Sequence, residues 1–150
     1  MGRAARPGKR VVLLDDTGHW AGCGTAWHLA EQGHEVTLVT PHAMVGRELE
    51  RTAADIPLRA KLKQLGVAMR TESAVTQWHG DGATVRNLLD GSENRVAADA
   101  LVLATANVAE NAAAGELAGS GMELHTVGDA LAPRRAHTAI YEGRKLGLRL

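Results

Sequence analysis

Apolar and polar residues follow one another along the first forty positions in the order strand, helix, strand. Val11 to Leu14 form a continuous apolar run, as a strand buried on both faces of a parallel sheet requires. Residues 22–32 carry apolar side chains at helical spacing, and Gly33 is suited to end that helix. Apolar and β-branched residues return over 35–39. This order and these lengths predict a right-handed crossover between two parallel strands.

The pattern continues with a second helix and a third strand. Residues 41–51 predict a loop or a short irregular helix. Asp55 is placed to cap the next helix, which has Pro57 in its first turn. The helix is indicated by leucines at positions i, i+4 and i+7, namely Leu58, Leu62 and Leu65. Gly66 ends this helix, and residues 67–69 then predict a short strand.

From residue 74 the spacing changes to that of antiparallel hairpins. Three short segments, 74–78, 83–88 and 95–97, are separated by turns rich in Gly, Asp and Asn. They predict an antiparallel meander. An apolar run over 101–104 predicts a further buried strand after it.

The last third of the chain carries weaker signals. An Ala- and Gly-rich connection leads to residues 123–127, which predict a last strand. Residues 136–150 predict a helix with Ile140 and Leu146 facing inward and basic residues toward its end. The whole pattern predicts an α/β fold: a three-layer, Rossmann-like domain with a parallel sheet and an inserted antiparallel β-meander. We expect one such domain over 11–150, after a loose basic leader over 1–10.

Charge and composition exclude several classes of partner. The 17 basic and 17 acidic side chains cancel, so nothing favours binding to nucleic acid or to an anionic membrane. No apolar run approaches the roughly 20 residues that span a bilayer. The single cysteine, Cys23, cannot form an internal disulfide and is compatible with a reducing cytoplasm. The seven histidines show no metal-ligand spacing, so no metal site is predicted.

The turn after the first strand is where a Rossmann-like domain binds a dinucleotide, and here it is irregular. The G-x-G-x-x-G fingerprint falls on Thr17, His19 and Gly22, so only the glycine that lets helix pack on strand remains. Gly18 allows a tight turn in another register, while His19 takes space that a pyrophosphate would use. Thr40 stands where an acidic residue would hold a ribose hydroxyl. The turn therefore argues against NAD(P). Gly18, His19 and Gly22 stay candidate cofactor contacts, and His19 can also be a gate or simply a polar residue of the turn.

Two further features of this turn have structural interpretations. Asp15 and Asp16 form an acid pair, which we expect to cap the turn or repel a phosphate, because nothing nearby indicates acid–base catalysis. Cys23 lies near a helix N-terminus, where a thiolate is favoured, but a small buried core residue is the preferred interpretation. No catalytic residue is predicted in this chain.

The tail LHTVGDALAPRRAHTAIYEGRKLG resembles the second FAD-contacting motif of flavoproteins with two dinucleotide-binding domains. In those proteins a strand ends in Gly-Asp and a helix follows, and the aspartate holds a ribityl or sugar hydroxyl. Residues 123–150 therefore resemble the returning C-terminal segment of an FAD-binding domain. The resemblance implies cofactor contacts at Gly128, Asp129 and Ala130. Arg134 would face a phosphate or an acidic partner.

Within that superfamily the chain is most similar to the C-terminal part of the trimethylamine, dimethylamine and histamine dehydrogenases, which are related to 2,4-dienoyl-CoA reductases and old yellow enzyme. The resemblance covers nearly the whole chain from Val11. It is carried by Leu13-Leu14-Asp15, Gly18-His19, Gly22, Gly24-Thr25-Ala26, LAEQGHEVTLVTP (29–41), Gly128-Asp129-Ala130 and Pro133-Arg134. Those dehydrogenases pass electrons from FMN through an iron–sulfur cluster to an electron-transferring flavoprotein, without nicotinamide.

The resemblance also implies that the catalytic flavin barrel, its cysteine cluster and the first FAD motif lie outside this sequence. We therefore expect a cytoplasmic accessory subunit that binds FAD or ADP jointly with a larger flavin-barrel subunit. FMN and the iron–sulfur cluster would be on that partner. A truncated remnant, a stand-alone NAD(P)-binding reductase or sensor, and a vestigial structural interaction module remain the alternatives.

Overall fold

The computed structural model describes residues 8–150, and its chain divides into two compact units, Met1–Thr105 and Ala106–Leu150. The sequence predicted one domain over 11–150. Most of the predicted leader over 1–10 lies outside the described residues. Its last residue, Arg10, belongs to the first strand. We describe each unit by itself.

A four-stranded parallel sheet forms the centre of the first unit. Its strands are β1 (Arg10–Asp15), β2 (Glu35–Val39), β3 (Ala68–Arg70) and β7 (Ala100–Ala104), in the order β3-β2-β1-β7. All three strand pairs of this sheet are parallel. Leu13 of β1, for instance, lies between Leu38 of β2 and Val102 of β7. The apolar runs predicted these strands because a parallel sheet is covered on both faces.

Helices cover one face of this sheet. They are α1 (Trp20–Glu31), the 3-10 helix η1 (Arg47–Thr52) and α2 (Asp55–Gln64). Leu13, Cys23, Ala26, Leu38 and Leu62 are all fully buried between these helices and the sheet. The helix predicted from Gly22 begins two residues earlier, at Trp20, and passes through Gln32 to a left-handed Gly33, as predicted.

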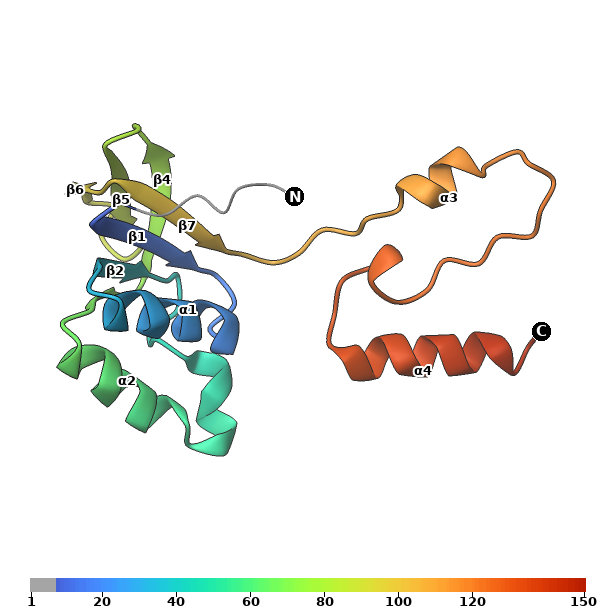
Figure 1. Cartoon of the computed structure of the whole chain (residues 1–150), viewed down its shortest axis with the longest axis horizontal. Helices are drawn as coiled ribbons and strands as arrows, with labels where there is room; N and C mark the ends of the chain where they lie inside the picture. The colour runs from blue at the N-terminus through green and yellow to red at the C-terminus, as the bar shows by residue number, and fades with distance from the viewer. Residues whose placement is uncertain (1–7) are drawn as a thin grey trace. The chain divides into compact units, whose positions relative to one another are not determined.

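The antiparallel meander covers the other face, so the first unit has three layers (Figure 1). Its strands are β4 (Ser73–Trp78), β5 (Gly82–Asn87) and β6 (Glu93–Ala97), paired in that order. The meander contributes Ala83 and Val85 to a second core, which also contains Val12 and Val39 of the parallel sheet. The predicted α/β, Rossmann-like fold with an inserted meander is confirmed.

The predicted N-cap of α2 is wrong. Ala54 precedes the helix and Asp55 is its first residue. The carboxylate of Asp55 does not cap the backbone; it accepts a hydrogen bond from Nη2 of Arg59 at 2.7 Å, one turn along the helix. The pairing of two side chains four residues apart has replaced the local cap that the sequence suggested.

The second unit contains two helices and a single 3-10 turn: α3 (Ala112–Glu116), η2 (Gly128–Ala130) and α4 (Ala136–Gly147). The strand predicted over 123–127 is absent from this unit, all of whose residues are described. A strand exists through hydrogen bonds to a neighbouring strand, and this unit contains none. Among 106–150 only Gly128 is buried.

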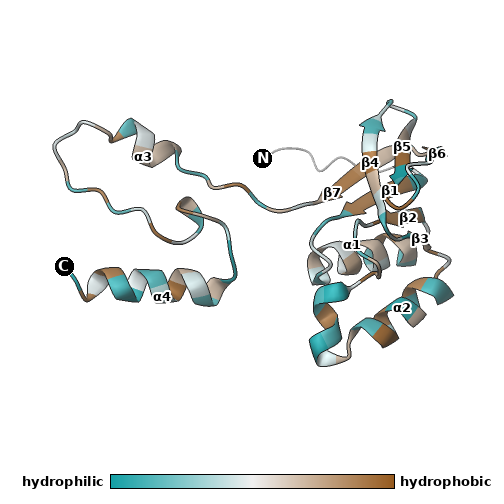
Figure 2. Cartoon of the chain, turned by 180° about the vertical axis from the view of Figure 1, so that it is seen from behind, coloured by the Kyte–Doolittle hydropathy of each residue, from teal (hydrophilic) through white to brown (hydrophobic). Residues whose placement is uncertain are grey.

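The helix α4 was predicted with Ile140 and Leu146 inward. Ile140 is 72% exposed, so that part of the prediction is wrong, whereas Leu146 is half-buried. Figure 2 shows apolar and polar stretches alternating along α4, as in an amphipathic helix. Within the second unit nothing covers the apolar face that contains Ile140. No helix of the described chain is long and apolar enough to cross a membrane.

Candidate functional site

In open parallel sheets, ligands bind beyond the carboxyl ends of the strands. In the first unit this edge contains Asp15 at the end of β1, the turn over residues 16–19, and the loop after β2, residues 40–46, with the start of η1. The candidate residues Gly18, His19 and Gly22 belong to this turn or to the start of α1. The hydrogen bonds of the two segments decide what this edge can bind.

The side chain of Asp15 organises the turn from inside the protein. Asp15 is completely buried, and its Oδ1 accepts hydrogen bonds from the backbone N–H groups of Thr17 (3.1 Å) and Gly18 (3.0 Å). The hydroxyl of Thr17 also donates to Oδ1, at 2.9 Å. These are backbone donors that a bound phosphate would require. Asp15 therefore caps the turn, which is one of the two roles predicted for the acid pair. Its carboxylate occupies these donors and brings a negative charge to the turn.

Glycine is required at position 22 because of Asp15. A Cβ on Gly22 would lie 2.4 Å from Cγ of Asp15, which is closer than atoms can approach. The helix α1 thus packs against the side chain at the end of β1. This is the function that the sequence predicted for Gly22, helix on strand, with the aspartate as the surface that it meets.

The thiol of Cys23 meets the same carboxylate. Its Sγ lies 3.5 Å from Oδ2 of Asp15, and Cys23 is fully buried. Burial raises the pKa of the Cys23 thiol from 9.0 to about 12, and the charge of Asp15 adds to that rise. The thiol is therefore protonated and unreactive at neutral pH, as expected of a core residue.

The loop after β2 closes over the turn. Nε2 of His42 lies 3.0 Å from the carbonyl oxygen of Asp16, and the N–H of Glu48 donates to the carbonyl of Gly18 at 3.0 Å. Gly18 is left-handed (φ +61°), and a Cβ there would lie 3.1 Å from His42 and 3.3 Å from Arg47. The tight turn at Gly18 is present, but the chain's own loop contacts it.

Two predicted positions at this edge offer little to a dinucleotide. His19 precedes α1 in an extended conformation, and its side chain makes no capping hydrogen bond. Thr40 is completely buried, so its hydroxyl cannot reach a ribose from solvent. With the N–H groups of Thr17 and Gly18 bonded to Asp15, this edge lacks the arrangement that holds a pyrophosphate and a ribose.

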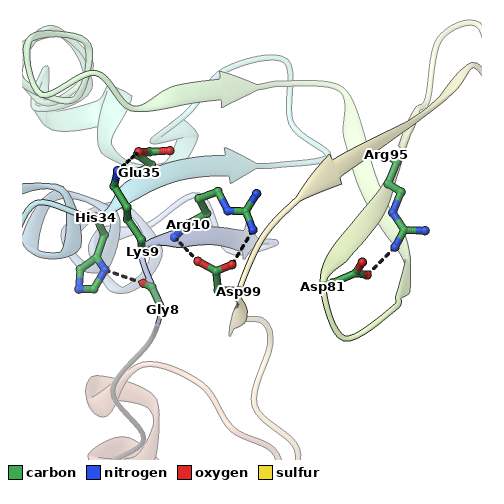
Figure 3. A network of polar contacts seen from close by, with 8 residues as sticks. All are labelled: Gly8, Lys9, Arg10, His34, Glu35, Asp81, Arg95 and Asp99. Carbon is green, nitrogen blue, oxygen red and sulfur yellow. Dashed lines mark hydrogen bonds and ion pairs between the residues drawn. The ribbon is translucent and has the colours of Figure 1, made fainter.

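The opposite end of the sheet is fastened by ion pairs (Figure 3). The backbone N–H and Nη2 of Arg10 both donate to the carboxylate of Asp99, at 2.9 and 2.7 Å. Lys9 pairs with Glu35, and Nδ1 of His34 lies 2.8 Å from the carbonyl of Gly8. A hollow of about 530 Å³ adjoins this network, lined by Arg10, His34 and Glu35 among others. Its charged groups are paired with one another at the amino ends of the strands, so we assign it a structural role.

In the second unit, the Gly-Asp motif forms the one-turn helix η2. Gly128 is left-handed (φ +62°), and its carbonyl accepts the N–H groups of both Leu131 and Ala132 at 3.0 Å. A Cβ on Gly128 would lie 3.2 Å from Cβ of Ala139 on α4. The glycine is therefore required twice, by its backbone conformation and by the close approach of α4.

Asp129 is exposed at the edge of a groove of about 530 Å³. The groove is lined by a short segment after β7 and by the Gly-Asp turn: Ala106, Asn107, Val108, Glu110, Asp129, Ala130 and Pro133. Oδ1 of Asp129 is 3.5 Å from the N–H of Arg134, a long contact that leaves it able to accept from a ligand. The lining suits a ligand with hydroxyl and amide groups.

The guanidinium of Arg134 is engaged within the protein. Its Nη2 pairs with Oε1 of Glu142 at 2.5 Å, and its Nε donates to the carbonyl of Ala132 at 3.1 Å. Arg134 was predicted to face a phosphate or an acidic partner. In this unit it faces an acidic side chain of its own chain.

Sequence reasoning missed Glu142, Asn107 and Glu110. Glu142 accepts the N–H of Gly128 at 2.8 Å, although fourteen residues separate them. Its position one turn after Ala139 on the predicted helix could have placed it near the motif. Asn107 and Glu110 follow β7 in a segment without periodicity, so only the folded chain brings them beside Asp129. Gly128, Asp129 and Ala130 lie together as one turn.

The sequence pattern of the pyridine nucleotide-disulphide oxidoreductase family matches residues 18–143, which include both candidate sites. None of the curated proteins matches the chain.

Several solved structures resemble it. A 6-hydroxypseudooxynicotine amine oxidase from Pseudomonas geniculata is 27% identical with a TM-score of 0.85, over 93% of this chain and 22% of that protein. A histamine dehydrogenase from a Rhizobium species is 26% identical with a TM-score of 0.82, over 96% of this chain and 23% of that protein. A 2-naphthoyl-CoA reductase (24% identity, TM-score 0.75, over 97% of this chain and 22% of that protein) shares the fold. The chain thus spans about a fifth of the length of these proteins.

Proposed function

The chain belongs to the pyridine nucleotide-disulphide oxidoreductase family, as a flavoprotein-type Rossmann domain, and we propose that it is an accessory subunit of an amine dehydrogenase-like oxidoreductase. Two of the similar solved structures are of enzymes named for amine substrates, an amine oxidase and a histamine dehydrogenase. The match extends over nearly the whole of this chain in both. Their likeness to the chain supports the resemblance to the trimethylamine and histamine dehydrogenases.

The proposed site is the groove beside Asp129. The observation that carries it is a Gly-Asp turn that exposes a carboxylate, next to Asn107 and Glu110. Carboxylate and amide oxygens accept hydrogen bonds from sugar or ribityl hydroxyls. Glu142 neutralises the nearby guanidinium of Arg134, so the groove favours the hydroxylated part of a nucleotide over its phosphates. We propose FAD or ADP as the ligand.

The exposed surface of the second unit supports a site shared with a partner chain. Leu131, Ile140 and Tyr141 are 56–72% exposed around the turn and α4. Exposed apolar patches of this kind mark contact surfaces. The proposed partner is a larger flavin-barrel subunit that carries FMN, an iron–sulfur cluster and catalysis, and that passes electrons to an electron-transferring flavoprotein. The assembly would reside in the cytoplasm.

The main alternative is a stand-alone NAD(P)-binding reductase or sensor. The turn after β1 disfavours it, because Asp15 holds the N–H groups of Thr17 and Gly18. Titration of the purified chain with NADH and NADPH tests this alternative directly. Saturable binding in the micromolar range would favour it over the accessory subunit.

Native mass spectrometry of the protein purified from its source, followed by acid release of bound cofactors, tests the main proposal. We expect a larger flavin-containing protein in the same complex, and FAD or ADP among the released nucleotides. A complex that lacks a flavin-barrel protein contradicts the proposal. A complex that releases no nucleotide, or a lone chain without nucleotide, points instead to a vestigial structural module.

A further inference from the structure

The carboxylate of Glu142 connects α4 to the Gly-Asp turn. The side chain is 18% exposed, and both of its oxygens are used. Oε2 accepts the backbone N–H of Gly128 at 2.8 Å, and Oε1 accepts Nη2 of Arg134 at 2.5 Å. A hydrogen bond to a carboxylate is stronger than one between neutral groups. The turn is therefore held to the helix by a charged group.

The network returns to the turn through Arg134. The backbone N–H of Arg134 points at Oδ1 of Asp129, 3.5 Å away, and its side chain is held by Glu142 and by the carbonyl of Ala132. The path thus begins at the N–H of Gly128 and ends at the carboxylate of Asp129. It fixes both residues of the motif relative to α4.

We infer that Glu142 is a positioning residue, which orients the Gly128–Asp129 turn so that the carboxylate of Asp129 meets a hydroxyl-bearing nucleotide in the adjoining groove. This inference rests on the proposed function. Without the Glu142 carboxylate, the N–H of the buried Gly128 has no partner within this unit, and Arg134 is released beside Asp129. A released guanidinium would pair with the Asp129 carboxylate and compete with the ligand.

Four variants of the full chain, in its complex where one is purified, test the role of Glu142. The probes are FAD and ADP, added to nucleotide-free protein and measured by equilibrium dialysis. Glu142→Leu removes both acceptors, and we expect it to weaken binding at least about tenfold. Glu142→Gln keeps an oxygen that can accept from Gly128 but loses the charge that holds Arg134, so its binding should fall between that of the natural protein and that of Glu142→Leu. Glu116→Leu, a matched change at an exposed glutamate on α3, should leave binding unchanged.

The fourth variant covers the case in which Glu142→Leu prevents the second unit from folding. Glu142→Asp keeps the charge but is one methylene shorter, so we expect its carboxylate to fall short of the N–H of Gly128, which Glu142→Gln can still reach. It should weaken binding as Glu142→Leu does. At saturating FAD, the visible circular dichroism of the flavin should differ between Glu142→Asp and the natural protein, because the ribityl contact has moved.

The outcomes separate this inference from the proposed function. If the natural protein binds neither FAD nor ADP, the proposed function fails, and the inference fails with it. If the natural protein binds a nucleotide and Glu142→Leu binds it equally well, only the inference is overturned. Equal losses in Glu142→Gln and Glu142→Leu also overturn it, since a positioning role through the Gly128 hydrogen bond predicts rescue by glutamine.

Discussion

At the residue scale, Asp15 explains why the turn after β1 departs from the dinucleotide fingerprint. Its buried carboxylate accepts three hydrogen bonds from Thr17 and Gly18 and contacts the thiol of Cys23. A phosphate at this turn would lose those donors and meet a negative charge. The missing glycines are thus replaced by a different, internally satisfied turn.

The contact between Asp15 and Gly22 predicts the effect of adding one methyl group. Gly22→Ala should destabilise the protein by about 1–3 kcal/mol, because the new Cβ would lie 2.4 Å from Cγ of Asp15. Gly24→Ala is the matched control on the same helix, where a Cβ meets nothing within 4 Å. It should stabilise the protein by about 0.5–1 kcal/mol. Urea unfolding of both variants measures the difference, and equal stabilities would refute the contact.

A second prediction concerns how the thiol of Cys23 makes folding stability depend on pH. Its pKa is raised from 9.0 to about 12, so the neutral thiol favours the folded state. This contribution is complete below pH 9.0 and is lost as the pH rises toward about 12, because the unfolded thiol ionises first. Ellman's reagent at pH 8 should react slowly with the folded protein and rapidly in guanidinium chloride. Cys23→Ala should lose less stability between pH 8 and pH 10 than the natural protein. Rapid labelling of the folded protein at pH 8 would contradict a buried thiol.

At the element scale, Arg10 and Asp99 join the first residue of β1 to the residue that precedes β7. The pairing places two distant parts of the chain in register, since Val11 is opposite Ala100. The guanidinium of Arg10 and its backbone N–H lower the pKa of Asp99, and Asp99 raises that of Arg10. Both side chains are partly exposed, so the ion pair itself contributes modestly.

Because its pKa is lowered, the carboxylate of Asp99 should make a contribution to folding stability that disappears in acid. It is present above the unfolded value of 3.8 and is lost as the pH falls through the lower folded value. Asp99→Asn should therefore lower the Tm at pH 7, and the gap from the natural protein should close toward pH 2. Asp81→Asn, at an exposed pair with Arg95, is the control and should change the Tm little. A constant gap across the pH range would show that the Asp99 charge is not responsible.

At the scale of the whole molecule, the two units differ in how much of their own surface they bury. The first has cores on both faces of its sheet, whereas the second buries only Gly128. Because burial of apolar area is the main stabilising force, we expect the second unit to be stabilised by contacts beyond itself. The proposed partner would supply such contacts.

Hydrogen exchange of the isolated chain measures this difference. We expect the amides of β1, β2 and β7 to be protected close to the global limit, and those of α4 to exchange at least about a hundredfold faster. Addition of the proposed flavin-barrel partner should slow exchange in α4 and leave the sheet unchanged. Equal protection of α4 and β1 in the isolated chain would show that the second unit is stable without a partner.

Local sequence determined the first unit well. The strands over 35–39 and 101–104, the helix ended by Gly66 and the meander follow from periodicity and turn residues, because each element's burial is encoded in its own spacing. The resemblance to flavoproteins, and not periodicity, singled out Gly128, Asp129 and Ala130. Local sequence also indicated that the first turn is poor for NAD(P).

Only the tertiary structure decided what depends on distant partners. The predicted strand over 123–127 does not form, since its pattern cannot supply a neighbouring strand. The sequence could not show that Ile140 is exposed, because an amphipathic pattern specifies an apolar face and not what covers it. Asp15 contacts Gly22, and Glu142 contacts Gly128. The residues in these contacts are seven and fourteen positions apart, so packing decides that they meet. Short-range periodicity fixes elements, whereas satisfaction of buried polar groups is decided by the fold.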